Sequence, residues 1–253
     1  MSIADKDVVK NQYATSTRLE TRINIHQKYS RNKYPFGKWV AGHYDLRPGE
    51  LVLEVGCGTG SMWQGVTLPE RCHVTLTDLS AGMLEAARQN TSHLNADYAI
   101  CDAMALPYDD HTFDAVIANM MLYHVPDISQ ALGEIHRVLK PSGRFYAATF
   151  GEHGAVEAVL DMLQLPCHVN HRFTLQNGAA QLSAYFKDLS VSCRDDALDV
   201  THLPDLVDYL RSMQGMTVLA KLPDERLLPV FTAHMKDGVL SLPKEYGLFI
   251  CRK

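Results

Sequence analysis

A turn rich in glycine follows directly on an apolar run at residues 51–55. Gly56, Gly58 and Gly60 alternate with other residues, and glycine lets a backbone approach a ligand closely. A helix that opens after such a turn offers free N–H groups to a polar ligand. Glu54 stands late in the apolar run, where a buried carboxylate needs a partner to offset its burial. The segment therefore predicts a site for a ligand that carries an ammonium group or a positively charged sulfur.

A second carboxylate, Asp78, ends the apolar run 73–77 and lies 22 residues after Gly56 (78 − 56). A carboxylate at this spacing after a glycine turn can accept both hydroxyls of a ribose. Its alternative role is to cap the next helix, for which Ser80 competes. A dinucleotide fingerprint would need Gly or Ala at its sixth position, where this chain has Ser61.

Short apolar runs rich in β-forming residues alternate with segments of helical spacing, which favours βαβ units and a parallel sheet. The runs are 51–55, 73–77, 96–101, 113–119 and 144–150. The clearest helix follows Pro126, where Asp127 is a good N-cap and Gln130 stands in capping-box position. Four apolar residues then share one helical face: Ile128, Leu132, Ile135 and Leu139. Residues 140–143, Lys-Pro-Ser-Gly, predict a turn into the next strand.

The two ends of the chain do not show this regular alternation of strand and helix patterns. Residues 1–47 are typical of helices, and after Phe150 helices are expected near 156–163 and 203–210, with strands near 189–194 and 246–252. No stretch resembles a linker. We expect one domain with a helical lid (1–47), a ligand-binding core (48–150) and a cap with the final strands (151–253).

Composition excludes several classes of protein. The 253 residues are 46% hydrophobic and 21% charged, as in globular chains, and the net charge of −5 does not favour nucleic-acid binding. No stretch is long and apolar enough to cross a membrane, and the first residues lack the apolar core of a signal peptide. Six cysteines without a C-x-x-C pair indicate reduced thiols and a cytoplasmic protein. The Cys167–His171 cluster lacks a second half, so no metal is expected.

The first fifty residues carry nine Lys and Arg against five acids, a local charge of +4. This excess is typical of a solvated helix face, or alternatively of a basic flap over an acidic or phosphorylated ligand. Arg22, His26 and Tyr29 share one helical face, which indicates either a substrate contact or ordinary amphipathic packing. Trp39 and Trp63 could line a pocket, although large aromatic residues are more often part of a core.

Five segments in order resemble the successive motifs of class I S-adenosylmethionine-dependent methyltransferases, the small-molecule group that includes ubiquinone/menaquinone C-methyltransferases. The segments are 51–60, 77–84, 101–108, 112–116 and 139–144, so the resemblance covers residues 48–150. It implies an α/β fold, a Rossmann-like doubly wound sheet of seven mostly parallel strands. The C-terminal segment 246–252 would supply its one antiparallel strand.

The resemblance also implies contacts with S-adenosyl-L-methionine. The residues that would contact the methionine moiety are Glu54, Gly56, Gly58 and Asn119, with Tyr13 and Tyr29 of the lid. Asp78 would contact the ribose, and adenine would be contacted by Leu79, Met83, Asp102 and Ala103. Asp102 has an alternative role as a turn cap after the third strand.

Methyl transfer is an in-line displacement, so the protein must align the reactants and exclude water. A general base is needed only if the nucleophile loses a proton. Tyr123 and His124 follow the fourth strand and are the catalytic candidates, while Arg22 and His26 are the substrate-binding candidates. His124 has an alternative structural role.

The expected partner is a small-molecule methyl acceptor, with no nucleic acid and no membrane. The sequence does not indicate whether oxygen, nitrogen, carbon or sulfur is methylated. Two alternatives remain: a protein that binds the cofactor or its demethylated product without turnover, and a nicotinamide-dependent dehydrogenase. Glu54, Ser61 and the Asp102 motif argue against the dehydrogenase.

Overall fold

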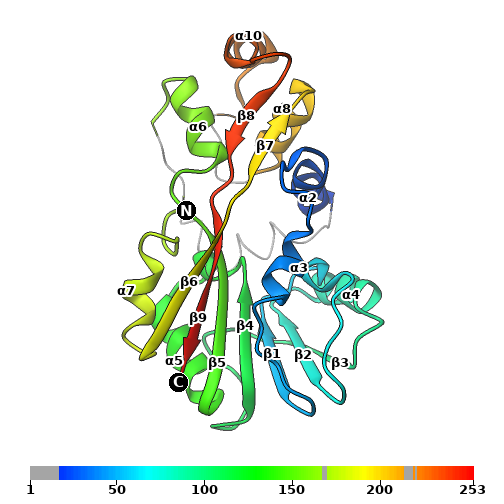
Figure 1. Ribbon diagram of the computed structural model, residues 1–253, viewed down its shortest axis with the longest axis vertical. Coiled ribbons are helices and arrows are strands. Elements are labelled where there is room, and N and C mark those ends of the chain that lie inside the picture. Colours follow the sequence, from blue (N-terminus) through cyan, green and yellow to red (C-terminus); the bar gives the residue numbers. More distant parts are fainter. Residues whose placement is uncertain (1–16, 167–169, 214–218, 220) are drawn as a thin grey trace.

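The fold is built on a seven-stranded sheet with the order β3-β2-β1-β4-β5-β9-β6 (Figure 1). The computed structural model describes residues 17–166, 170–213, 219 and 221–253. The strands are β1 (Leu51–Val55), β2 (His73–Asp78), β3 (Ala96–Ile100), β4 (Phe113–Asn119), β5 (Leu139–Phe150), β6 (Asp188–Arg194) and β9 (Tyr246–Arg252). Neighbours among β1 to β5 pair in parallel, whereas β9 is antiparallel to both β5 and β6. The fold class predicted from the sequence is therefore confirmed.

Both faces of the sheet are covered, which is why its central strands are almost continuously apolar. Leu53 of β1 packs on the face that carries α5 (Ile128–Val138). Val52, its neighbour, packs on the opposite face with α3 (Phe36–Ala41), α4 (Ala81–Asn90) and the short helix η1 (Ser61–Trp63). The strand order reverses between β1 and β4, and at such a point a crevice opens beyond the carboxyl ends of the strands.

In the segment before β5, the structure confirms some of the local features that the sequence predicted and changes others. Asp127 caps α5 by accepting a hydrogen bond from the Gln130 N–H at 2.9 Å. The reciprocal half of the expected capping box is absent, because the Gln130 side chain donates to the Met104 carbonyl. The predicted turn at 140–143 lies inside the bounds of β5 as an irregularity, in which Ser142 has φ 63°.

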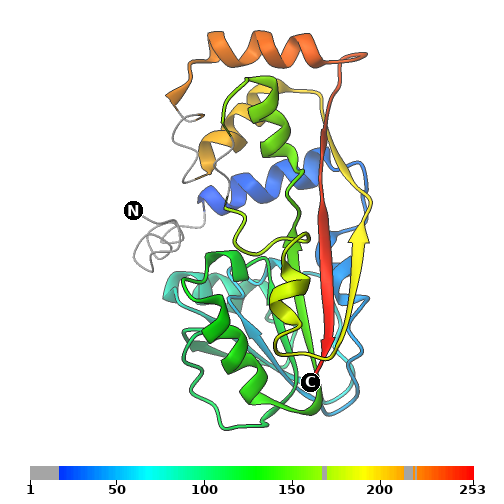
Figure 2. The same ribbon diagram turned by 90° about the vertical axis from the view of Figure 1, so that its left-hand side faces the viewer.

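A layer that the sequence predicted only in part lies above the carboxyl ends of the strands (Figures 1 and 2). We call it the cap: α2 (Thr17–Tyr29), α6 (Ala155–Met162), α8 (Leu203–Ser212), α10 (Asp224–His234) and the antiparallel pair β7 (Ala197–Val200) and β8 (Leu240–Pro243). Each of these elements contributes to one separate apolar cluster, through residues such as Ile25, Val159, Leu206, Phe231, Leu198 and Leu240. Helices near 156–163 and 203–210 were expected, whereas α10 and the β7–β8 pair were not.

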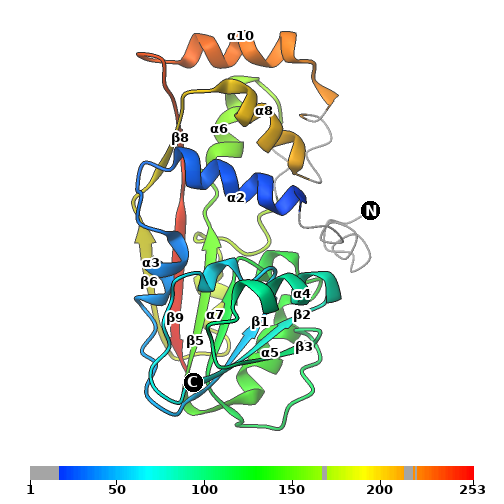
Figure 3. The ribbon, with the colours of Figure 1, turned by 90° about the vertical axis from the view of Figure 1, so that its right-hand side faces the viewer.

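Helix α2 belongs to the cap by its contacts (Figure 3). Lys28 at its end pairs with Asp205 of α8 at 2.5 Å, and Arg31 beyond it pairs with Asp199 of β7 at 2.8 Å. Part of the N-terminal basic excess therefore ties α2 to the rest of the cap. Among the described residues, no helix has the length and apolar composition needed to cross a bilayer.

Candidate active site

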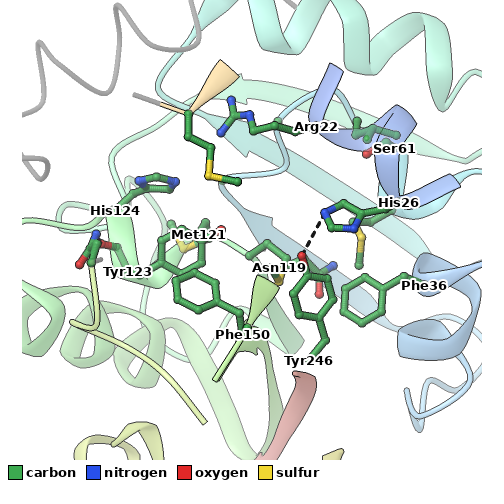
Figure 4. A pocket seen from close by; sticks show the side chains of 18 of the residues that line it. Arg22, His26, Phe36, Ser61, Asn119, Met121, Tyr123, His124, Phe150 and Tyr246 are labelled. Carbon is green, nitrogen blue, oxygen red and sulfur yellow. Dashed lines mark hydrogen bonds between the residues drawn. The ribbon is translucent and has the colours of Figure 1, made fainter. Parts of the chain in front are cut away.

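A cavity of about 460 Å³ lies between the carboxyl edge of the sheet and the cap (Figure 4). Its lower side is formed by the ends of β1, β2 and β4 and by the loop after β3, and its upper side by residues from α2, α6 and α8. Of the residues predicted to contact the cofactor, eight line it: Gly56, Gly58, Asp78, Leu79, Met83, Asp102, Ala103 and Asn119.

The glycine turn after β1 has a backbone that glycine adopts readily. Gly56 and Gly58 have φ of 67° and 56°, in the left-handed region that side chains with a Cβ disfavour. A Cβ on Gly56 would lie 2.9 Å from the Met121 side chain, whereas a Cβ on Gly58 would meet nothing within 4 Å. Gly58 therefore borders open space, as a turn that receives a ligand requires.

Asp78 holds this turn in place. Its carboxylate accepts hydrogen bonds from the backbone N–H of Gly58 and of Ser80, both at 2.9 Å. The N-cap of α4 is Ser80, which accepts from the Met83 N–H at 3.3 Å, so Asp78 remains at the cavity wall. Burial raises the pKa of the Asp78 carboxyl, and the three backbone N–H groups around it counteract that shift.

Asp102 caps a turn and lies at the cavity wall, and its contact with adenine stays a prediction. Its Oδ1 accepts from the Met104 N–H at 3.0 Å, as in a turn cap, and the residue also lines the cavity beside Ala103.

Glu54 lies behind the cavity wall and is 1% exposed. Its two carboxylate oxygens accept from the Trp63 indole N–H at 2.5 Å and from the Asn119 side-chain amide at 2.8 Å. Asn119, which does line the cavity, also contacts the Tyr44 hydroxyl. Burial raises the pKa of Glu54 to about 7, although the hydrogen bonds from Trp63 and Asn119 act to lower it. Glu54 therefore does not line the cavity, contrary to the expected contact with the ligand, and Trp63 is a core residue.

Tyr29 is not where it was expected. The side chain is 4% exposed, and its hydroxyl donates to Asp205 of α8 at 2.5 Å, so it packs inside the cap. The prediction of a ligand contact was wrong because Tyr29 ends α2 on the face that α8 covers. His26 and Arg22, one and two turns earlier on α2, do line the cavity. Tyr13 lies outside the described residues.

The rest of the cavity wall contains residues that the sequence analysis missed. They are mostly aromatic or Met side chains from distant elements: Phe36, Met121, Phe150, Tyr209, Met213 and Tyr246. No local motif marks them, since only the packing of the cap on the sheet brings them together. In sequence they differ little from other core residues.

Tyr123 and His124, the predicted catalytic pair, both line the cavity from the short helix η2 (Leu122–His124). The Tyr123 ring lies 4.5 Å from the rings of His124 and Phe150, centroid to centroid. Burial and the nearby Arg22 guanidinium lower the pKa of His124 to about 4. At neutral pH its imidazole is therefore uncharged, so that one ring nitrogen can accept a hydrogen bond.

Two other carboxylates at the cavity wall, Glu157 and Glu245, are hydrogen-bonded within the protein. Glu157 accepts from the His171 ring at 3.0 Å and from the Gly154 N–H at 3.1 Å. Glu245 accepts from the His153 N–H at 2.9 Å and from the Gln176 amide at 2.8 Å. His171 thus has a carboxylate partner, and the described residues contain no cluster of three or more side chains suited to a metal ion. The Cys167 end of that segment lies outside the described residues.

Comparison with known proteins identifies the family. Residues 53–147 match a family described as "Methyltransferase domain". A demethylmenaquinone methyltransferase of Staphylococcus epidermidis is 41% identical over 145 residues, and the match covers 55% of this chain and 59% of that protein. A malonyl-[acyl-carrier protein] O-methyltransferase of Erwinia billingiae is 33% identical over 182 residues, with 71% of this chain and 69% of that protein covered.

The fold comparison agrees. The structure of phosphoethanolamine N-methyltransferase 2 of Haemonchus contortus with S-adenosyl-L-methionine superimposes with a TM-score of 0.61 at 19% identity. That match covers 100% of this chain and 60% of the other. The chain spans 59% of the length of the Staphylococcus relative but more than two thirds of the Erwinia one. It belongs to the class I S-adenosylmethionine-dependent methyltransferases, and its cofactor is S-adenosyl-L-methionine.

Proposed function

We propose that this protein transfers the methyl group of S-adenosylmethionine to a small-molecule acceptor. The observation that carries the proposal is the cavity of about 460 Å³, whose sheet side holds the residues that the family resemblance assigns to the cofactor and whose cap side is lined by aromatic and Met side chains. Methyl transfer needs the two reactants aligned in one space from which water is excluded. A cap packed over the carboxyl edge of the sheet supplies that enclosure.

The residues on the sheet side fit the cofactor. Gly58 borders open space, and the Asp78 carboxylate beside it suits the ribose hydroxyls. Leu79 and Met83 supply apolar contacts for adenine, and Asn119, backed by Glu54, suits the polar end of the methionine moiety. When bound, the cofactor supplies an electrophilic methyl group, and the chain's own residues supply position.

The acceptor chamber suits a small, mainly apolar molecule. Its rings and Met side chains favour an apolar or aromatic body, and Arg22 contributes a positive charge near His124. One relative is named for demethylmenaquinone, which is compatible with such an acceptor, whereas the other is named for malonyl-[acyl-carrier protein]. We assign Arg22 and His26 to acceptor binding, and Tyr123 and His124 to the reaction itself.

The proposal is tested in two stages. Calorimetry with S-adenosylmethionine, S-adenosylhomocysteine and NAD should show binding of the first two and none of NAD. Incubation with S-adenosylmethionine and a metabolite extract should then yield S-adenosylhomocysteine. Binding without any product in extracts that support other methyltransferases would favour a non-catalytic binding protein. Tight binding of NAD alone would overturn the proposal.

Two further predictions accompany this function. The division of the chain into a lid (1–47), a core (48–150) and a cap (151–253) stays a proposal. It is changed in one respect, because residues 17–29 of the expected lid pack with the cap. The cytoplasmic location stays a prediction from the cysteines.

A further inference from the structure

We infer that the Tyr246 hydroxyl, held by the His26 imidazole, is the group that contacts a hydroxyl nucleophile of the acceptor and receives its proton. This inference rests on the proposed function. It adds a catalytic residue, Tyr246, and it gives His26, which the proposed function places in acceptor binding, the role of orienting Tyr246 and taking up its proton.

Tyr246 lies where an acceptor must approach. It is the first residue of β9 and stands opposite Phe150 at the end of β5, while Asn119 of β4 stands opposite Ala148 of the same strand. With strands about 4.8 Å apart, Tyr246 is two strands from Asn119 and slightly higher above the same edge. Figure 4 shows its hydroxyl directed into the cavity toward His26.

The Tyr246 and His26 side chains are in contact, and other aromatic rings pack around them. The Tyr246 hydroxyl oxygen lies 3.2 Å from His26 Nε2. The His26 ring meets the rings of Tyr209 and Tyr246 edge-on, with centroids 5.6 and 5.7 Å away, and Phe36 lies 5.3 Å from Tyr246. These rings hold the imidazole in one orientation.

The protonation states follow from the surroundings. Burial lowers the pKa of His26 to about 3, Lys244 adds to that shift and Asp196 opposes it. Burial, with the nearby Tyr209, raises the pKa of Tyr246 well above its usual value. The pair is therefore a neutral imidazole and a protonated phenol at neutral pH.

The direction of the hydrogen bond follows in turn. Tyr246 keeps its proton, and His26 Nε2 is the partner that the described structure gives to its hydroxyl. We therefore assign the donor role to Tyr246 and the ring proton to Nδ1, which has no hydrogen-bond partner in the described part of the chain. The Tyr246 oxygen then has lone pairs left to accept a hydrogen bond from an acceptor hydroxyl.

This arrangement completes the transfer without a strong base. As the acceptor oxygen bonds to the methyl carbon, the carbon–sulfur bond breaks and its electron pair stays on sulfur. The hydroxyl proton passes to the Tyr246 oxygen, and the Tyr246 proton passes to His26 Nε2. A methylated oxygen that still carries its proton is an oxonium, a far stronger acid than imidazolium, so even a weakly basic imidazole takes the proton.

The charge in the cavity also stays constant. One positive charge leaves sulfur as one appears on His26, so the weak basicity of the empty site is no obstacle to the step. The nearby carboxylates, Glu157 and Glu245, are engaged by other donors and do not compete for this proton.

The test uses a pair of probes that differ in one hydroxyl. Protein saturated with S-adenosylhomocysteine is titrated at pH 7 with 2-naphthol and with 2-methoxynaphthalene, followed by fluorescence. One hydrogen bond should make the wild-type protein bind the naphthol about 3- to 10-fold more tightly than the ether. Tyr246→Phe keeps the ring contacts and should abolish the preference, and His26→Leu should reduce it.

Tyr185→Phe is the matched control, because its hydroxyl bonds the Ser129 carbonyl away from the cavity. It should keep the wild-type preference. Equal binding of the two probes by wild type, or binding of neither, would overturn the inference. Binding of S-adenosylhomocysteine in the same samples separates this result from a failure of the proposed function.

A second readout addresses His26 directly. Nitrogen NMR of the histidine rings should show Nδ1 protonated and Nε2 as a hydrogen-bonded acceptor in the wild-type protein. Tyr246→Phe should shift the Nε2 signal, which a purely structural role of the tyrosine ring would leave in place. A proton on Nε2 in the wild-type protein would reverse the assigned hydrogen bond and overturn the inference.

Discussion

The buried carboxyl of Glu54 should make the stability of this protein depend on pH in a way that one substitution removes. Burial raises the pKa of Glu54 from 4.5 to about 7, against hydrogen bonds from Trp63 and Asn119. The native state therefore holds a proton that the unfolded chain has lost between these two pH values. Stability from this carboxyl is fully present below pH 4.5 and is lost as the pH rises through 7.

The size of the effect follows from the shift. A rise of about 2.5 pKa units, at about 1.4 kcal/mol per unit, corresponds to about 3 kcal/mol of lost unfolding free energy between pH 4.5 and 8. Glu54→Gln keeps the shape of the protonated side chain and an oxygen for the Trp63 N–H, and it carries no titrating group. The variant should therefore gain about 3 kcal/mol relative to wild type over that range.

The assay is urea unfolding at pH 5, 6, 7 and 8, followed by tryptophan fluorescence. Burial lowers the pKa of His26 to about 3 and of His124 to about 4, so both destabilise the fold as the pH falls below 6.5. That effect is common to the two proteins and cancels in their difference. Glu85→Gln, at an exposed site on α4, is the control. A difference between Glu54→Gln and wild type that stays constant with pH would refute the reasoning.

The same carboxyl links pH to cofactor binding. An ammonium group near Asn119 would favour ionised Glu54, so binding at pH 7 should release about half a proton. Calorimetry in two buffers of different ionisation enthalpy measures that release. Glu54→Gln should show none.

Three further predictions concern the site. Asp78→Ala should weaken binding of S-adenosylmethionine by about 1–3 kcal/mol in calorimetry, since it removes a charge-assisted acceptor and frees the Gly58 N–H; unchanged affinity would misplace the ribose site. Gly58→Val should weaken it further, because a β-branched residue is strained at φ 56°, while circular dichroism should still show a folded protein. His124→Ala should leave cofactor affinity nearly unchanged and lower turnover by about 10²–10⁴ if His124, in place of the Tyr246–His26 pair, takes the proton, with a smaller loss for Tyr123→Phe. In that case wild-type kcat/KM should fall as the pH drops through about 4, and a variant that matches wild type across that limb would leave His124 a structural role.

The sequence determined the sheet and the cofactor side of the site because both are encoded locally. Apolar runs of β-forming residues became β1 and β4 with the predicted bounds. The expected strand at 246–252 became β9, and its antiparallel direction is the one that the family resemblance implied. Gly58 and Asp78 were identified because a turn and the strand ends beside it impose fixed spacings in the chain. Both residues lie at the cavity wall.

Only the tertiary structure decided the arrangement of the cap and the part of the cavity wall that the cap supplies. The pairing of β7 with β8 joins segments some forty residues apart, and nothing in either segment names its partner. Glu54 had a predicted need for donors, but Trp63 and Asn119 became those donors through packing. Tyr29 and His26 lie on the same helix, and which of them meets the cavity depends on where α8 covers α2. The β7–β8 pairing, the donors to Glu54 and the place of Tyr29 all depend on contacts between segments distant in the chain. A local sequence pattern does not predict such contacts.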